Sequence, residues 1–564
     1  MRIVVKKENL KRVIFILILL FSQILIASKI YAKGMNTVVA GANVAVTNIE
    51  NGKVQGFMRN DIYTYLGIPY AKAERFMPPK KLEKWQNTYM AFMYGDISLQ
   101  SSGNPMKSFL FDGPTLKQSD DAQNLNIWTP AINDGKKRAV MVWLHGGGLS
   151  NGSSIESYSY HGENLSKKGD IVVVSVNHRL NAIGFLDLSA YGEEYKYSAN
   201  LGIMDLVAAL EWIKENIENF GGDPNNVTIF GESGGGAKVL TLMATPAAKG
   251  LFHKAIVQSG AVERMGMTLT KPESGRRVAE LTLEYLGLNK KEVKKLKDIP
   301  YEKLLEASNK ALADTAKEQN LKAVRGGGIG LAWAPTMDGD YIPVEPVGEK
   351  YSIQSKDIPL LIGSNLTEWE TIYAGLLNTN DFSKNLYSNK NTWTNEEIEK
   401  RINEKYREHA VAIKEAFKKA YPNRNIADVL YVDSFLRTPA LKTARLKADQ
   451  NGAPVYNYIF SWDTPVLDGI PMSYHTAEIA FVMNNVTDYE FATGGQKEAQ
   501  ELADKMSQAW INFAKTGNPN VKGMAKWEAF TRENGAVMIF DNKIEQKYKH
   551  DEELMRLLAP NFNF

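Results

Sequence analysis

Six short runs of apolar, largely β-branched residues recur along the chain. They lie at residues 139–144, 171–176, 227–230, 254–259, 359–364 and 455–460. Runs of this length and composition are typical of strands that are buried on both faces of a sheet. Between them lie stretches with helical spacing, such as residues 201–220, whose apolar positions recur every three or four residues before Gly221-Gly222. The alternation of strand and helix predicts βαβ units and a large, mostly parallel sheet flanked by helices.

Three further segments complete the predicted architecture. Residues 44–59 alternate apolar and polar positions around Asn51-Gly52, which predicts an antiparallel N-terminal hairpin at one edge of the sheet. Residues 265–335 and 375–450 are more polar and rich in lysine, with helical spacing, and we interpret them as helical excursions from the sheet. Because no repeat or Pro/Ser-rich linker interrupts the sequence, residues 33–564 are predicted to form a single α/β domain.

The first 32 residues have the pattern of a secretory signal peptide. A basic start is followed by an almost unbroken apolar run and then by small residues near the predicted cut, at Ala32 or Gly34. The alternative is an uncleaved membrane anchor, but the apolar core is short for a membrane span. We therefore expect an exported protein without a stable membrane span after cleavage.

Charge and cysteine content exclude several classes of function. The leader holds six basic residues and one acidic residue, so the formal net charge of +3 becomes −2 for the remainder of the chain. This balance gives no electrostatic reason to expect a nucleic-acid partner. The sequence contains no cysteine, which excludes disulfides, thiolate metal sites and cysteine nucleophiles.

Ser233 stands in the pattern G-x-S-x-G, at residues 231–235, between a predicted strand and a predicted helix. In this context the turn is so tight that the serine backbone is strained and the residues two positions away must lack side chains. A glycine-rich loop that merely contains a serine is the alternative. The strand–turn–helix context favours an exposed nucleophile.

A second glycine-rich segment, His145-Gly146-Gly147-Gly148, directly follows the strand at residues 139–144. Backbone N–H groups without side chains can approach the oxyanion that forms during acyl transfer, as this loop does in lipases and esterases. A phosphate-binding loop would need a different glycine spacing or a Walker lysine. His145 is interpreted as a structural residue that holds the loop.

A nucleophilic serine needs a base and an acid. Among the seven histidines, His475 lies on a loop after a predicted strand, and it follows the serine in the chain. The acid is expected between the two, which makes Glu368 a candidate because it follows the strand at 359–364. Its role would be to fix the imidazole tautomer and stabilise the imidazolium. Spacing alone leaves Glu370 and Asp338 as competitors.

Together these segments resemble the type-B carboxylesterases, a family that includes cholinesterases and bacterial p-nitrobenzyl esterases. The resemblance covers nearly the whole chain after the leader. It rests on YLGIPYA (65–71), SDDAQNLNIWTP (119–130), WLHGGG (143–148), VNHRLNAIGFL (176–186), the segment 200–236 with GESGGG, SYHTAEIAFVM (473–483) and AWINFAKTGNPN (509–520).

The resemblance implies an α/β-hydrolase fold and a catalytic triad of Ser233, Glu368 and His475. It also implies an oxyanion hole formed by the N–H groups of Gly147, Gly148 and Gly234. The expected substrate is a small-molecule carboxylic ester, and neither a metal nor an organic cofactor is expected. Within the family motifs Glu368 fills the acid's place, which favours it over Glu370.

The sequence departs from the family at several positions near the predicted site. Thr367 and Trp369 flank the acid where the family usually has aspartate and glycine, and Gly234 replaces a frequent alanine. Ser98 and Ala122 occupy the positions of two cysteines that many members pair, so the loop at 99–121 is not stapled. In cholinesterases the corresponding loop carries the tryptophan that binds the choline cation. Residues 99–121 contain no tryptophan, so the resemblance implies poor choline selectivity. Phe109 and Phe111 are candidates for lining a pocket.

Two other functions are consistent with these motifs. A cholinesterase-like binding or adhesion protein would share the fold without using the triad. The same triad would also serve amide, carbamate or thioester bonds. The natural substrate and the oligomeric state do not follow from the sequence.

Overall fold

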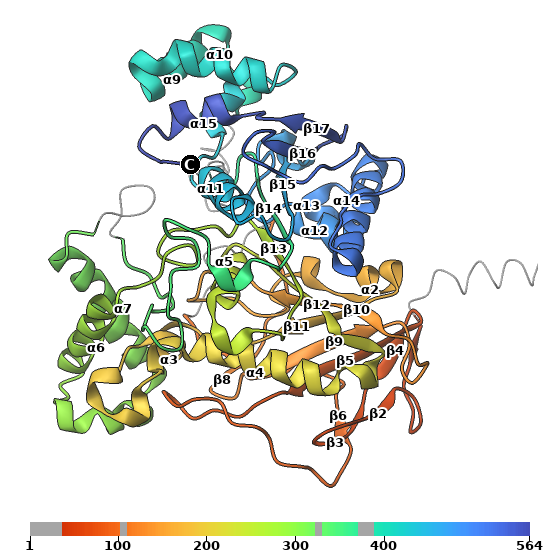
Figure 1. The fold of residues 1–564 in the computed structure, drawn as a ribbon, viewed down its shortest axis with the longest axis vertical. Helices are drawn as coiled ribbons and strands as arrows, with labels where there is room; N and C mark the ends of the chain where they lie inside the picture. The colour runs from red at the N-terminus through yellow and green to blue at the C-terminus, as the bar shows by residue number, and fades with distance from the viewer. Residues whose placement is uncertain (1–36, 102–109, 322–329, 370–388) are drawn as a thin grey trace, which may run out of the picture.

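The computed structural model describes residues 37–101, 110–321, 330–369 and 389–564. Over these residues a twelve-stranded sheet runs through the molecule (Figure 1). In spatial order its strands are β1 (Val38–Val39), β4 (Phe57–Arg59), β5 (Ile62–Pro69), β9 (Asn124–Thr129), β11 (Val172–Val176), β10 (Arg138–Leu144), β12 (Gly222–Glu232), β13 (Lys254–Gln258), β14 (Leu360–Asn365), β15 (Val455–Phe460), β16 (Ala536–Phe540) and β17 (Glu545–Tyr548).

The middle of the sheet is parallel and its two edges are antiparallel. Strands β11, β10, β12, β13, β14, β15 and β16 pair in parallel. Strands β1, β4, β5 and β9 form one antiparallel edge, and β17 closes the other. All six strands predicted from apolar runs are present, so the prediction of a mostly parallel sheet is confirmed.

The predicted N-terminal hairpin forms, but the prediction that it adds strands to one edge of the large sheet is wrong. Strands β2 (Val46–Ile49) and β3 (Gly52–Gln55) pair antiparallel, with Ile49 opposite Gly52. They form a small separate sheet with β6 (Tyr89–Met90), and only the following strand, β4, joins the large sheet. The chain passes from one sheet to the other at Gly56, where a Cβ atom would lie 2.2 Å from the carbonyl oxygen of Thr64.

Helices cover both faces of the sheet (Figure 1). The longer ones are α2 (Glu163–Gly169), α4 (Leu201–Asn216), α5 (Gly234–Ala244), α6 (Pro272–Tyr285), α7 (Tyr301–Glu318), α9 (Asn395–Tyr406), α10 (Ala410–Ala420), α11 (Arg437–Ala448), α14 (Lys497–Thr516) and α15 (Glu552–Leu558). Short helices are α3 (Asn181–Phe185), α12 (Ile479–Val482) and α13 (Glu490–Thr493). Both predicted excursions contain helices: α6 and α7 belong to the first, and α9, α10 and α11 to the second. Residues 322–329 and 375–388 of these segments lie outside the described residues.

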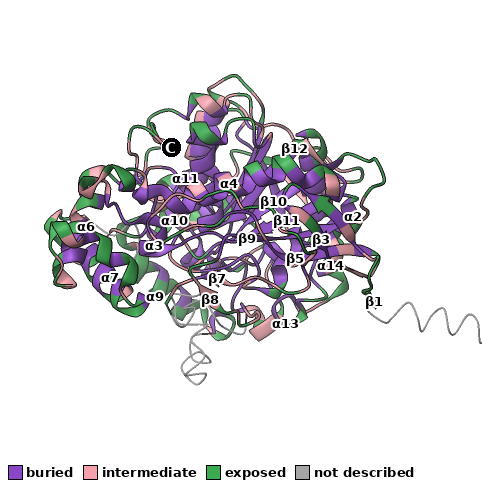
Figure 2. Ribbon diagram, turned by 90° about the horizontal axis from the view of Figure 1, so that it is seen from below, coloured by how far each residue is buried: buried purple, intermediate pink, exposed green. Residues whose placement is uncertain are grey.

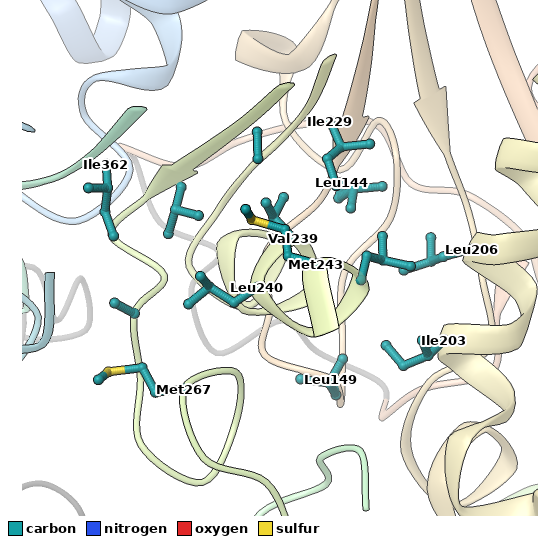
Figure 3. Packing of buried hydrophobic residues seen from close by; sticks show 14 of the residues in the cluster. Leu144, Leu149, Ile203, Leu206, Ile229, Val239, Leu240, Met243, Met267 and Ile362 are labelled. Carbon is teal, nitrogen blue, oxygen red and sulfur yellow. The ribbon is translucent and has the colours of Figure 1, made fainter. Parts of the chain in front are cut away.

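Strand alternation sorts the core into two layers. On β10, Val140, Val142 and Leu144 face the layer that contains α4, α5 and α11, whereas Met141 and Trp143 face the layer that contains α2, α12 and α14. Buried residues fill the centre of the molecule, and exposed ones lie along outward sides of peripheral helices such as α6 and α7 (Figure 2). Figure 3 shows how Val239, Leu240 and Met243 anchor α5 against the sheet. This packing fixes the start of α5, where the candidate nucleophile lies.

Candidate active site

Ser233 forms the sharp turn between the end of β12 and the start of α5. Its backbone has φ 54° and ψ −124°, a strained conformation for a residue with a side chain. A Cβ atom on Gly231 would lie 2.5 Å from the carbonyl oxygen of Leu144, and one on Gly235 only 1.9 Å from the same oxygen. The two outer glycines of the motif are therefore required because β10 passes directly against the turn.

The predicted oxyanion loop lies on the other side of Ser233. Gly147 and Gly148 have φ values of 75° and 62°, in the region that favours glycine. Within the described parts of the chain, no hydrogen bond to the protein uses the N–H group of Gly147, Gly148 or Gly234. The carbonyl oxygen of Gly148 lies 2.2 Å from the place that a Cβ atom on Gly234 would take, which accounts for glycine instead of alanine after the serine.

His475 and Glu368 are brought together at the carboxyl ends of neighbouring strands. Nδ1 of His475 lies 2.6 Å from a carboxylate oxygen of Glu368, and both side chains are almost fully buried. Glu368 follows β14, and His475 lies in the segment after β15. Because β14 and β15 are parallel, the two loops emerge side by side at one edge of the sheet.

The Glu368–His475 pair is held from behind. The hydroxyl of Ser259 donates a hydrogen bond of 2.6 Å to the second oxygen of Glu368, and the backbone N–H of Asn365 donates one of 2.7 Å. The backbones are also joined, because Glu368 donates to Ser473 and accepts from His475. These contacts fix the carboxylate that would orient the imidazole.

Two further buried carboxyl groups surround the imidazole. An oxygen of Glu232 lies 3.2 Å from Nε2 of His475. Glu478 accepts hydrogen bonds from Asn365 and Gln258. Burial raises the pKa of Glu232 well above its usual range, and the charges of Glu478 and Glu368 raise it further. Burial also raises the pKa of Glu478, and Glu368 adds to this effect. Both shifts favour the protonated forms of Glu232 and Glu478.

A cavity of about 160 Å³ connects these groups. Its lining residues are Phe111, Gly146, Gly147, Gly148, Asn151, Glu156, Tyr160, Glu232, Ser233, Trp369, His475 and Thr476. The candidate nucleophile, the candidate base and two glycines of the loop therefore face one space. Phe111 contributes to the wall, whereas Phe109 lies outside the described residues.

A buried lysine supports the glycine loop from below. Nζ of Lys238, on α5, donates a hydrogen bond of 2.8 Å to the carbonyl oxygen of His145, and burial lowers the lysine pKa to about 7. The ring of His145 stacks on that of His178 with centroids 5.0 Å apart. Burial, followed by the charge of Lys238, lowers the pKa of His145 well below its usual range. These contacts fit the structural role predicted for His145.

The rival acids occupy different places. Asp338 accepts a hydrogen bond from Asn200 and caps its own turn, and Glu370 lies outside the described residues.

The loop at 99–121, predicted to lack a disulfide, is closed by backbone pairing. Strands β7 (Ile97–Ser98) and β8 (Gln118–Ser119) form a short parallel ladder near its two ends.

Sequence reasoning missed Glu232, Ser259 and Lys238. Glu232 is part of the G-x-S-x-G motif at residues 231–235, but its contact with His475 depends on how segments far apart in the sequence meet. Ser259 follows directly after β13, at the same edge of the sheet as the other site residues, and this position is the signal that would have identified it. Nothing in the local pattern around Lys238 distinguishes it from a surface lysine.

The described residues show neither a metal-binding cluster nor a membrane-spanning helix. They contain no group of three or more His, Asp or Glu side chains placed to hold a metal ion. Among the same residues, no helix has the length and apolar character needed to cross a membrane.

Proteins similar to this chain include esterases. The chain matches the Carboxylesterase family over residues 43–556. It is 32% identical over 523 residues to the para-nitrobenzyl esterase of Bacillus subtilis, covering 92% of this chain and 99% of that protein. The structure resembles that of an esterase from Clostridium hathewayi that can hydrolyze aliphatic aromatic polyesters, with TM-score 0.83, 34% identity and coverage of 94% and 100% of the two chains. It also resembles a carboxylesterase of Geobacillus stearothermophilus, with TM-score 0.68, 31% identity and coverage of 91% and 99%.

The sheet, its flanking helices and the serine turn define an α/β-hydrolase, as predicted. Within this class, the chain belongs to the carboxylesterase family and is a carboxylic ester hydrolase.

Proposed function

We propose that this hydrolase cleaves carboxylic esters through an acyl-enzyme on Ser233. One observation carries the proposal: the strained Ser233 turn and the buried Glu368–His475 pair face the same cavity. A binding protein would have no need of a strained serine beside a hydrogen-bonded histidine–carboxylate pair.

In the proposed mechanism, Nε2 of His475 takes the hydroxyl proton as Ser233 Oγ attacks the ester carbonyl carbon. Glu368 accepts the Nδ1–H hydrogen bond and stabilises the imidazolium. The N–H groups of Gly147, Gly148 and Gly234 bind the oxyanion of the tetrahedral intermediate. His475 then protonates the leaving alcohol, and the same histidine activates water to release the acid.

The raised pKa of Glu232 fits this sequence of proton transfers. A protonated carboxyl beside Nε2 adds no second negative charge to the site. Glu368 remains the carboxyl group that is hydrogen-bonded to the imidazole, through Nδ1.

The test is hydrolysis of p-nitrophenyl esters with acyl chains of graded length. We expect turnover by the wild type and a fall in kcat of about 10⁵ in Ser233→Ala. Glu368→Gln keeps the shape of the acid but removes its charge, and should lower kcat by about 10⁴. A wild type without activity, or a Ser233→Ala variant as active as the wild type, would favour the binding or adhesion alternative. Amide, carbamate and thioester substrates of matched size test the other bond types.

The relatives motivate the first aromatic substrates to try. One is named for p-nitrobenzyl esters and another hydrolyses aliphatic aromatic polyesters. We propose that esters with an aromatic acid or alcohol are accepted here, a proposal that p-nitrobenzyl acetate and a benzoate ester test directly.

We also propose that residues 1–32 direct export and are then removed. The support is the basic, apolar and small-residue order of this segment. N-terminal sequencing of the protein recovered outside the cytoplasm should begin at Lys33 or Met35. A full-length chain retained in the membrane would contradict removal.

A further inference from the structure

Trp369 lies against the flat face of the candidate base. Its ring centroid is 4.1 Å from that of His475, and the two rings are inclined by only 31°. The edges of the imidazole already contact carboxyl groups, with Glu368 at Nδ1 and Glu232 near Nε2. The indole therefore covers one face of the ring, whereas Glu368 holds its Nδ1 edge.

This contact bears on the protonated form of the imidazole. During the proposed reaction His475 becomes a cation, and the face of an indole is the most favourable aromatic partner for a cation. The carboxyl groups of Glu368 and Glu232 lie beside the ring, and Glu478 and Glu156 lie close enough to Glu232 to raise its pKa. Tyr458 and Tyr160 are tyrosines near these carboxyl groups. The indole thus adds a stabilising contact that is strongest when His475 carries the proton taken from Ser233.

Trp369 also forms part of the cavity wall. It lines the space together with the aromatic rings of Phe111 and Tyr160 and with the glycine loop. The cavity of about 160 Å³ is close to the roughly 150 Å³ of a cavity that binds benzene. By this comparison, a group the size of one six-membered ring matches the space that Trp369 helps to enclose.

We propose that Trp369 is a positioning residue for His475 and sets the upper size of the group that the cavity accepts, at about one six-membered ring. This inference rests on the proposed function, since it concerns the same reaction.

The positioning role is tested with Trp369→Phe and Trp369→Leu, which both preserve an apolar side chain, whereas only phenylalanine preserves an aromatic face. For p-nitrophenyl acetate we expect kcat to fall about tenfold in Trp369→Leu with KM little changed, and much less in Trp369→Phe. The acid limb of the kcat/KM profile should move to lower pH by about one unit in Trp369→Leu. Equal kcat values and superimposable pH profiles for the wild type and both variants would overturn this role.

The size limit is tested with Trp369→Ala and two substrate series. One series varies the acid, using p-nitrophenyl acetate, benzoate and naphthoate; the other varies the alcohol, using phenyl and naphthyl acetate. The quantity compared is the ratio of kcat/KM for the naphthyl compound to kcat/KM for the single-ring compound. In at least one of the two series, this ratio should be at least tenfold higher in Trp369→Ala than in the wild type. An unchanged ratio in both series would overturn the size limit. Wild-type turnover of p-nitrophenyl acetate separates these outcomes from a failure of the proposed function, which would abolish it.

Discussion

Three buried carboxyl groups lie at the Glu368–His475 pair, and each comes from a different part of the chain. Glu232 comes from the end of β12, Glu368 from the loop after β14, and Glu478 from the segment after β15. Three ionised carboxylates at this spacing would repel one another strongly in a buried site. The raised pKa values of Glu232 and Glu478 favour their protonated forms and so reduce this repulsion, while Glu368 contacts Nδ1 of the imidazole.

This arrangement predicts a pH dependence of stability. The folded protein keeps a proton on Glu232 that the unfolded chain releases near its ordinary pKa of 4.5, so the wild type loses stability as the pH rises above that value. Glu232→Gln removes this titration. The free energy of unfolding of Glu232→Gln minus that of the wild type should therefore rise from pH 5 to pH 8, by up to about 1.4 kcal/mol per pH unit.

Urea unfolding at four pH values measures this difference. Glu302→Gln on α7 is the control, because Glu302 is exposed and its variant should follow the wild type at every pH. A constant difference between Glu232→Gln and the wild type across this range would contradict the protonated state of Glu232.

At the residue scale, the sequence predicted Ser233 and the glycine loop because both depend on local geometry. A tight strand–helix turn and a side-chain-free loop leave their marks in consecutive residues. The roles of Glu232 and Ser259 were not predictable in this way, since each arises from contact between segments more than a hundred residues apart.

At the scale of elements, β10, β12 and α5 form the rigid frame of the site. The carbonyl oxygen of Leu144, at the end of β10, fills the space beside both Gly231 and Gly235. The frame therefore leaves no room for a side chain at either glycine, although Gly235 lies in a helix, where alanine is otherwise preferred.

Gly235→Ala tests this close packing. The added methyl group would lie 1.9 Å from Leu144 O and 2.9 Å from His145 O, so the strand and the helix must separate. We expect a loss of about 3 kcal/mol in stability and a large loss of esterase activity. Gly41→Ala is the matched control, because its methyl group would meet only Val44 Cγ2 at 3.6 Å. If the two variants had the same thermal unfolding midpoint, β10 and α5 would accommodate the added methyl group at little cost. That result would contradict the close packing at Gly235.

Elements in the middle of the sheet were predicted more readily than those at its edges. Buried parallel strands such as β10 and β11 are continuous apolar runs, whereas β17 (EQKY) is polar and only pairs with one neighbour. The separate sheet of β2, β3 and β6 was also not predictable, because the switch at Gly56 depends on the approach of β5.

At the scale of the whole molecule, a buried ion pair ties the C-terminal segment to the body of the fold. Arg437 on α11 makes two hydrogen bonds to Asp551, of 2.8 and 2.9 Å, and a third to Asn457 on β15. Both charged side chains are almost completely buried. The pair joins two segments that are 114 residues apart. Asp551 belongs to the end of the chain, after β17.

Asp551→Asn should destabilise the protein by about 3–5 kcal/mol, because it leaves the guanidinium of Arg437 buried without its counter-charge. The exposed pair Arg532–Asp449 has the same two-bond geometry, and Asp449→Asn should cost less than about 1 kcal/mol. Chemical denaturation of both variants makes the comparison. Similar losses in the two would contradict a special role for the buried pair.

The overall architecture followed from the sequence because strand and helix patterns alternate over most of its length. The packing of the helical excursions did not, since amphipathic helices such as α6 and α7 fix which side is buried but not which part of the sheet they cover. The residues of the cavity wall come from five separate segments, and for this reason the size of the accepted group required the structure.

The most direct test of the central claim is covalent labelling of the protein with a fluorophosphonate, followed by intact mass measurement and peptide mapping. An activated serine reacts with such a reagent, whereas an ordinary serine does not. We predict one adduct per chain, located on Ser233, absent in Ser233→Ala and formed far more slowly in His475→Ala. An adduct on another residue, or equal labelling of the wild type and Ser233→Ala, would contradict the assignment of Ser233 as the nucleophile.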